Sequence, residues 1–398
     1  MKSTLVNQMD IAQSFGRLKG FCEKENFRGW DPYDGLNSTV FRSLPLLSKS
    51  RIARLAWIQL FKKNPVNLRG ITGIKKDYNA KGLGLFLHGY CNLWKLANRP
   101  DYLDKIRFLA DLLLESRSKG YSGSCWGYNF DWQARAFFQP KYTPTVVATT
   151  FIAYALMEAY DITRDNKYLE AAIDSQFFIL NDLNRTYDSD GNFAFSYSPQ
   201  DTTQVFNASL LGSRLLARIY SYTGDSLLLA EAKKSVNFCT KHQNENGSWT
   251  YGTLPFHQWI DNFHTGYNLE CITEYQKYSR DKSYNDNITR GLTYYLDTFF
   301  TEKGECKYYH NKLYPIDVHN TSQLIITLSR LDQAYKNKEL IDKVLDWTIN
   351  NMQHQKGFFY YQLKKGISSR IPYIRWAQAW MFYGMTEYFL AFNLSPEK

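Results

Sequence analysis

The sequence lacks the features that define several common classes of protein. No run approaches the roughly 18 consecutive apolar residues of a membrane-spanning helix, and the first ten residues lack the continuous apolar core of a signal peptide. The six cysteines lie far apart and form no CxxC pair, so we expect neither a zinc knuckle nor a disulfide framework. The cytoplasm is therefore the simplest expected location.

Linkers rich in proline, serine or glycine are also missing. A chain of 398 residues would ordinarily form two or three domains, but an internal repeat indicates one large domain. The net charge of +10 makes an acidic partner plausible. Because the basic residues are spread along the chain, apart from Lys62-Lys63 and Lys75-Lys76, and no nucleic-acid-binding motif is present, we do not expect that partner to be nucleic acid.

The chain repeats one local pattern with a period of about 60 residues, which is typical of an array of helical hairpins. In each repeat, an aromatic loop precedes the start of a helix that is rich in small residues. The copies are Cys125–Tyr128 before Pro144, Phe193–Phe195 before Phe206–Ser209, Trp249–Tyr251 before Asp261–Gly266, Tyr308–Tyr309 before Asp317–Ser322, and Phe358–Tyr360 before Pro372–Trp376.

Each of these helices ends at a polar turn, such as Thr223-Gly224-Asp225, whose acid caps a second helix. We therefore expect inner helices to begin near residues 82, 145, 204, 262, 318 and 374, with outer helices after the first five. The amphipathic run over residues 48–61 should supply the sixth outer helix. This pattern predicts an all-α fold, an (α/α)6 toroid over residues 46–398, with an N-terminal arm or lid over residues 1–45.

The first turns of the inner helices are the expected place for a site. Parallel inner helices bring their N-terminal ends to one mouth, where unpaired N–H groups and a partial positive charge suit an anionic ligand. In each repeat, small residues follow this position and allow close packing of the helices. The residue before them differs from repeat to repeat, so functional residues are expected at that position. These variable residues are Val147, Asn207, His264, Asn320 and Trp376.

Two Asp and His pairs stand at such positions. Asp261 precedes His264 by one helical turn, and an Asp–His pair can orient and tune a general base. His319 lies beside Asp317 in the next repeat. The alternative is structural, because Asp is a common helix N-cap and a histidine among aromatic residues can simply be packed.

Cationic and polar residues are expected to bind the substrate. An arginine at the start of the last inner helix can hold a carboxylate or phosphate in a bidentate manner, and a tryptophan beside it can stack on a sugar. The turn-rich segment over residues 29–38 should cover the mouth. The expected binding residues are Asp31, Asp34, Arg69, Lys81, Trp126, Asn207, Asn320, Arg370, Arg375 and Trp376.

Gln243 with Trp249, and Gln353 with Phe359, resemble the QW motif of terpenoid cyclases, in which the glutamine caps a helix and ties repeats together. That role is structural. The Asp-x-Asp-Asp run that those cyclases use for protonation does not occur, and the zinc ligands of protein prenyltransferases are not evident. An isoprenoid-binding toroid is therefore kept only as an alternative, and no metal is expected.

Residues 29–38, 67–69 and 78–86, with Asp261–Gly266 and Arg375–Trp380, resemble a poorly characterised family of toroidal proteins associated with bacterial and archaeal surface-polysaccharide synthesis. At the superfamily level the repeats are similar to six-hairpin glycosidases, uronate lyases and epimerases, and terpenoid cyclase-like toroids. The resemblance implies a carbohydrate-active protein whose partner is an acidic oligosaccharide or a lipid-linked glycan, with peripheral association with membrane-bound polysaccharide machinery. It bears on the fold more than on any catalytic residue.

Three functions stay open. A cofactor-independent lyase or epimerase would use His264, Tyr251 or Tyr373 to take the proton beside a carboxylate that an arginine neutralises. A glycoside hydrolase would need two carboxyl groups across one bond, such as Asp261 with Asp317, or either of them with Asp131 or Asp34. A non-catalytic glycan-binding or scaffold protein would need only the aromatic and polar lining.

Overall fold

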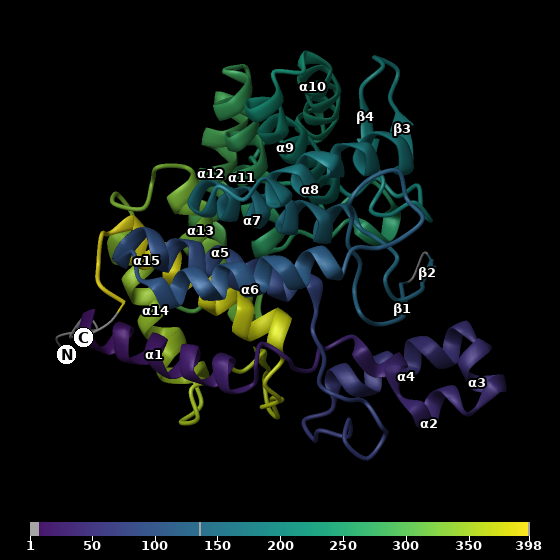
Figure 1. The fold of residues 1–398 in the computed structure, drawn as a ribbon, viewed down its shortest axis with the longest axis vertical. Coiled ribbons are helices and arrows are strands. Elements are labelled where there is room, and N and C mark those ends of the chain that lie inside the picture. Colours follow the sequence, from purple (N-terminus) through teal and green to yellow (C-terminus); the bar gives the residue numbers. More distant parts are fainter. Residues whose placement is uncertain (1–7, 135–136, 397–398) are drawn as a thin grey trace.

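The computed structural model describes residues 8–134 and 137–396, so residues 1–7 of the predicted arm lie outside it. In the described chain, six inner helices form a ring inside six outer helices. Figure 1 labels them. The inner helices are α5 (Ala80–Ala97), α7 (Val146–Thr163), α9 (Phe206–Thr223), α11 (Asn262–Ser279), α13 (Val318–Arg330) and α15 (Trp380–Ala391), the last continuing the π-helical turn η4 (Ile374–Ala379). The outer helices are α6 (Pro100–Glu115), α8 (Asn166–Phe177), α10 (Ser226–Lys241), α12 (Asn285–Phe299), α14 (Lys338–Met352) and α1 (Gln8–Lys24).

The ring is closed by contacts between consecutive inner helices. Each inner helix packs against the next, and α15 packs against α5. The helices α6, α8, α10, α12 and α14 each pack against the inner helix before them in the chain. With η4 taken as the start of the last one, the inner helices begin within two residues of the expected positions, and the predicted (α/α)6 toroid is confirmed.

The burial of the helices follows their sequences. The first twelve residues of α7 are all buried, because an inner helix contacts neighbours on every side and its sequence is apolar or small all round. The outer helix α12 buries only Gly291, Tyr295 and Phe299, which stand four residues apart and form one apolar stripe. The same difference distinguishes inner from outer helices in the other repeats.

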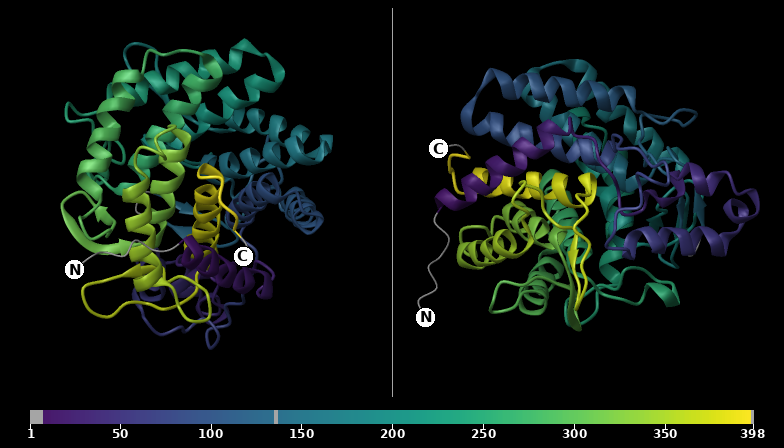
Figure 2. Two further views of the ribbon diagram at one scale, coloured as in Figure 1. Left: turned by 90° about the vertical axis from the view of Figure 1, so that its left-hand side faces the viewer. Right: turned by 90° about the horizontal axis from the view of Figure 1, so that it is seen from below.

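The sixth outer helix is α1, and the prediction that residues 48–61 supply it is wrong. In both views of Figure 2, α1 lies beside the C-terminal helix, and it packs against α15 and α14. Gln353 ties it to the ring, because its side-chain amide donates to the carbonyl of Ser14 at 2.9 Å and accepts from the Ser14 hydroxyl at 2.7 Å. Gln243 bonds Asn287 of α12 in the same way, as the QW-like motifs predicted.

Residues 48–61 do form a helix, within α4 (Arg51–Lys63), but it packs elsewhere. Together with η1 (Asp34–Asn37), α2 (Thr39–Arg42) and α3 (Pro45–Lys49), it forms an extension at the side of the ring (Figure 1). Its apolar side packs through Trp57 and Ile58 against Leu36 and Phe41. An amphipathic pattern predicts a helix but does not specify the surface that it covers.

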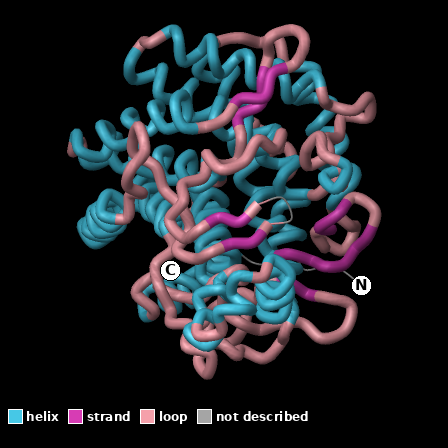
Figure 3. The backbone as a smooth tube through the Cα atoms, turned by 90° about the vertical axis from the view of Figure 1, so that its right-hand side faces the viewer, coloured by secondary structure: helices cyan, strands magenta, loops and turns pink. Residues whose placement is uncertain are grey.

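Short strands and long loops gather on the face where the inner helices begin (Figure 3). Asp317, for example, is both the last residue of a strand and the N-cap of α13. The loops on this face therefore form the rim of the mouth. The strands are β1 (Trp132–Gln133), β2 (Phe138–Gln139), β3 (Arg185–Tyr187), β4 (Phe193–Phe195), β5 (Lys307–Tyr309), β6 (Lys312–Asp317) and β7 (Gln362–Leu363), paired antiparallel as β1-β2, β3-β4 and β5-β6-β7.

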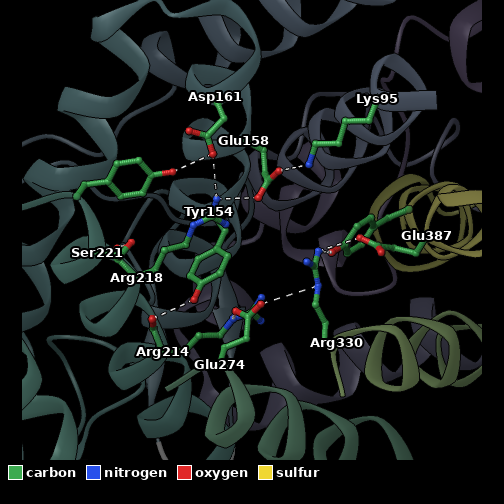
Figure 4. Close-up of polar contacts among 12 residues, drawn as sticks. Lys95, Tyr154, Glu158, Asp161, Arg214, Arg218, Ser221, Glu274, Arg330 and Glu387 are labelled. Atoms are coloured by element: carbon green, nitrogen blue, oxygen red, sulfur yellow. Dashed lines mark hydrogen bonds and ion pairs between the residues drawn. The ribbon is translucent and has the colours of Figure 1, made fainter. Parts of the chain in front are cut away.

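A buried ionic network fills the opposite end of the ring (Figure 4). Arg214 bonds Glu270 and Glu274, each at 2.6 Å, and both carboxylates are buried. Burial alone would raise the pKa of Glu274, but the charges of Arg214, Arg330 and Arg218 lower it to about 2. Arginines are expected here, because parallel helices bring their partly negative C-terminal ends together at this place.

We predict that Arg214→Leu lowers the free energy of unfolding by about 3–5 kcal/mol, because it leaves two buried carboxylates without their partner. Urea denaturation measures this loss. Arg290→Leu is the matched control, since the Arg290–Asp286 pair is exposed and its removal should cost less than about 1 kcal/mol. Equal losses in the two variants would contradict a central role for the network.

Candidate functional site

A cavity of about 740 Å³ lies at the mouth of the ring. In the described part of the chain its lining contains no Asp or Glu, and its polar residues are mostly histidines and cations. These polar residues are Gln59, Lys62, Lys63, Lys81, Gln133, Thr203, Asn207, His257, His264, His319 and Arg375. The aromatic residues are Tyr33, Tyr128, Phe130, Trp132, Phe137, Tyr197, Tyr251, Phe256, Trp259, Phe263, Tyr267, Tyr308, Tyr309, Trp376 and Trp380.

The pair of Asp261 and His264 opens α11. Asp261 is the N-cap and accepts from the backbone N–H of His264 at 3.3 Å. Its two carboxylate oxygens also lie 3.0 and 2.9 Å from Nδ1 of the same histidine. Since an ionised carboxylate can only accept, Nδ1 is the donor in this pair, and in the neutral ring Nε2 then keeps a lone pair. The His264 side chain is 18% exposed and that of Asp261 only 1%, so the histidine faces the cavity and the acid lies behind it.

His319 lies deeper, on α13. Its ring is stacked on Trp380 at 4.0 Å, and its Nε2 shares a hydrogen bond of 3.0 Å with the hydroxyl of Tyr267. Burial, and then the charge of Lys81, lower the pKa of His319 well below its ordinary value, so the ring is neutral. His319 is thus a neutral, packed partner of Tyr267 rather than a second copy of the Asp261–His264 pair.

Arg375 is held by an acid from the N-terminal segment. Its Nε and Nη2 donate to the two oxygens of Asp31 at 2.6 and 2.9 Å, a buried bidentate pair. The guanidinium also lies 4.9 Å from the ring of Tyr128 and 5.1 Å from that of Trp376. Arg375 lines the cavity, and Nη1 makes no hydrogen bond to the described residues, so it is available to an anionic ligand.

Asp34 and Arg69 support this pair from outside the cavity. Asp34 accepts from the backbone N–H of Asp31 at 2.9 Å and from Nε of Arg69 at 2.7 Å. Arg69 donates in turn to the carbonyl of Asp31 at 2.8 Å. Asp31, Asp34 and Arg69 were predicted to bind substrate directly, but the structure buries all three behind Arg375, where they position it.

Lys81 enters the floor of the cavity from the first turn of α5. Its ammonium lies 4.4 Å from the ring of Phe151, 5.2 Å from Trp380 and 5.8 Å from Tyr267. Burial, and then the charge of Arg375, lower the pKa of Lys81 well below its ordinary value. The described residues give it no carboxylate partner, so a bound anion would be a favourable neighbour.

Asp317 orients Trp376. Both of its oxygens lie 3.1 Å from Nε1 of the indole, and Gln362 donates to it at 2.7 Å. Asp317 also caps α13 through the N–H of His319. Asp317 was predicted to act directly on substrate, but it is fully buried and does not line the cavity.

Several other predicted residues lie away from the cavity lining. Trp126 is buried and its indole donates to the carbonyl of Leu113. Asn320 is buried and bonds the carbonyl of Lys307, and Tyr373 is buried against Arg69. Arg370 is exposed and lies over the ring of Tyr360. A residue in the first turn of an inner helix thus lies near the mouth, but the side of the helix on which it lies decides whether its side chain reaches the cavity.

Other lining residues were not predicted. Trp259 stacks on Tyr251 at 4.2 Å and 15°, which forms a flat surface suited to a sugar ring. Tyr267 follows His264 by three residues, a spacing that places both on one helical face and could have identified it. Lys62 reaches the rim from α4 and donates to the Tyr33 hydroxyl at 2.6 Å, a contact between distant segments that no local pattern indicates.

No protein-family model and no curated protein sequence matches this chain. Solved structures match its fold. An unsaturated glucuronyl hydrolase specific for heparin aligns with a TM-score of 0.63 at 10% identity over 98% of this chain and 99% of that one. A polysaccharide lyase aligns with a TM-score of 0.57 at 11% identity over 96% and 95% of the two chains. The cellobiose 2-epimerase from Bacillus thermoamylovorans aligns with a TM-score of 0.58 at 12% identity over 78% and 88%. The expected likeness to six-hairpin toroids is confirmed for the fold.

Burial raises the pKa of Asp317 from its ordinary 3.8 to about 7, although its hydrogen bonds oppose the shift. The folded state therefore holds this proton more tightly than the unfolded state, and the resulting stability is present below pH 4 and is lost as the pH rises to about 7. We predict that Asp317→Asn gains stability relative to the parent protein across this window. Urea denaturation at several pH values tests it, with the exposed Asp286→Asn as a control that should show no such trend.

Proposed function

We propose that the protein is a carbohydrate-active enzyme, a cofactor-independent lyase or epimerase that acts beside the carboxylate of an acidic glycan. The observation that carries this proposal is the Asp261–His264 pair on the wall of an aromatic cavity that also presents Arg375. Structures with the same fold include a polysaccharide lyase and a cellobiose 2-epimerase, so the fold is compatible with such chemistry.

Elimination and epimerisation begin with the same step. Nε2 of His264 accepts the proton from the carbon next to the carboxylate, and the electron pair moves onto the carboxylate to form an enolate. Arg375 and the N-terminal ends of the inner helices stabilise this added negative charge. Asp261 stabilises the imidazolium that results, because its carboxylate accepts from Nδ1.

The second step distinguishes the two reactions. In elimination, the enolate electrons form a carbon–carbon double bond and the glycosidic oxygen on the adjacent carbon leaves with a proton. In epimerisation, a proton returns to the carbon from the opposite face. Tyr251 and Tyr267 are suited to donate that proton, since their rings lie 4.8 and 5.8 Å from that of His264. Burial raises the pKa of both tyrosines, which keeps their hydroxyls protonated.

Glycoside hydrolysis is less well supported. It needs two carboxyl groups that face one bond, whereas Asp261 and Asp317 accept hydrogen bonds from His264 and Trp376 behind the cavity wall. Asp131 forms an ion pair with Arg42. A non-catalytic glycan-binding protein is the alternative if no turnover is found. The polysaccharide-biosynthesis context, the association with membrane-bound machinery and the cytoplasmic location stay predictions.

We predict that the protein converts uronate-containing oligosaccharides, and that His264→Ala lowers kcat by about 10²–10⁴-fold, the range for loss of a general base. Mass spectrometry distinguishes the reactions, because elimination products are lighter by one water than hydrolysis products, whereas epimers keep the substrate mass. His354→Ala is the matched control, since His354 stacks on Phe358 outside the cavity. Full turnover by a folded His264→Ala protein would reject this base.

We predict that Arg375 recognises the substrate carboxylate. Asp31→Asn with Arg375→Gln removes both charges of the buried pair together and so leaves no unpaired buried charge. Affinity for the acidic oligosaccharide should fall about 10–100-fold, while affinity for the same oligosaccharide with its carboxylates reduced to alcohols should change little. Calorimetry measures both. Equal losses for the two ligands would show that Arg375 only maintains the shape of the cavity.

A further inference from the structure

The extension beside the ring exposes an unusual share of apolar side chains. Eight of the eighteen large hydrophobic residues that are exposed in the described chain belong to residues 40–71, less than a tenth of the protein. Leu46 is 90% exposed, and Ile52 and Ile71 are each 80% exposed. On α4, Ile52, Ala56 and Leu60 are four residues apart and form one exposed stripe. An exposed apolar stripe of this kind is typical of an interaction site.

The same part of the chain is strongly basic. Residues 36–76, named here the basic extension, contain nine Lys and Arg and no Asp or Glu, and so carry nine of the chain's ten net positive charges. Most basic residues are spread along the chain, as expected, but the absence of acids from this segment concentrates the net charge there. Arg69 is buried, and Arg42 and Lys76 pair with acids outside the segment. Lys49 and Lys75 are exposed and form no ion pair with the described residues.

We propose that the basic extension binds the surface of a membrane rich in anionic phospholipids. Exposed aliphatic side chains flanked by lysine and arginine are what an interfacial helix presents to such a surface, with apolar groups entering the acyl boundary and cations on the head groups. None of the helices in the described part of the chain combines the length and apolar character needed to span a bilayer. A second copy of this chain is a poor occupant, because pairing two such faces would oppose like charges.

The position of the basic extension links this surface to the cavity. Leu55, Gln59, Lys62 and Lys63 lie on α4 and line the mouth, while Ile52, Ala56 and Leu60 lie on its exposed stripe. A glycan attached to a lipid carrier would therefore reach the mouth from the bilayer against which α4 lies. This last step rests on the proposed function, whereas binding to the membrane surface does not.

The test is co-sedimentation of the full-length protein with vesicles. We expect binding to roughly a three-to-one mixture of phosphatidylcholine and phosphatidylglycerol, little binding to phosphatidylcholine alone, and loss of binding at high salt. Leu46→Glu and Ile52→Glu should each lower the partition coefficient about tenfold. Lys49→Gln and Lys75→Gln should each lower it about fivefold.

Leu227→Glu is the matched control. Leu227 is exposed on α10, at the far end of the molecule from α3 and α4 (Figure 1), so its replacement should leave vesicle binding unchanged. The proposal is overturned if neutral vesicles bind as well as anionic ones, if the control variant loses as much binding as Ile52→Glu, or if the basic extension instead captures an acidic protein and ignores vesicles.

Vesicle binding and turnover are measured separately, so the two proposals can fail separately. Ile52→Glu should keep the activity of the parent protein on a water-soluble acidic oligosaccharide, because Ile52 does not line the cavity. Activity without vesicle binding would overturn the membrane surface alone. Vesicle binding without any turnover would overturn the proposed function alone.

Discussion

The parallel direction of the six inner helices is the constraint on which the rest of the structure depends. Because the helices are parallel, their N-terminal ends share the mouth and their C-terminal ends share the opposite end, so partial charges of one sign collect at each. Toward the C-terminal end, the buried arginines Arg214 and Arg218 bond acids from neighbouring helices. At the mouth, N-capping aspartates perform the complementary task. The ring therefore has a filled, ionic end and an open end that favours anions.

Three aspartates, two of which are helix N-caps, also shape the chemistry of the open end. Asp261, Asp317 and Asp31 each lie one layer behind the wall and hold a different side chain toward the cavity: a histidine, a tryptophan and an arginine, respectively. The carboxylates thus hold the side chains that line the cavity and do not line it themselves. The cavity wall therefore presents a histidine, a flat ring and a cation rather than paired acids, which supports the proposed proton abstraction over hydrolysis.

The repeat made the fold predictable from sequence, because each copy carries its own turn, cap and small-residue helix. The pair of Asp261 and His264 was predictable for the same reason, since both residues belong to one helical turn. The contact of Asp31 with Arg375 joins residues more than 300 positions apart, and no local pattern indicates it. Residues such as Trp126 and Asn320 were misjudged because the first turn of a helix projects side chains in several directions, and only packing shows which of them reaches the cavity.

The start of the last inner helix explains where the N-terminal segment meets the ring. This helix begins with a π-helical turn and its N-cap, Tyr373, makes no side-chain cap bond, so its first N–H groups need partners from elsewhere. The backbone of Trp30 supplies one, by accepting from Ile374 at 2.9 Å, and Asp31 then meets Arg375. The chain between α1 and α5 is not required to close the ring, because α1 already covers α15. That segment instead supplies Asp31 to Arg375, forms part of the mouth and continues into the basic extension. The part of the chain that departs from the sixfold repeat thus gives the toroid the surfaces that are specific to this protein.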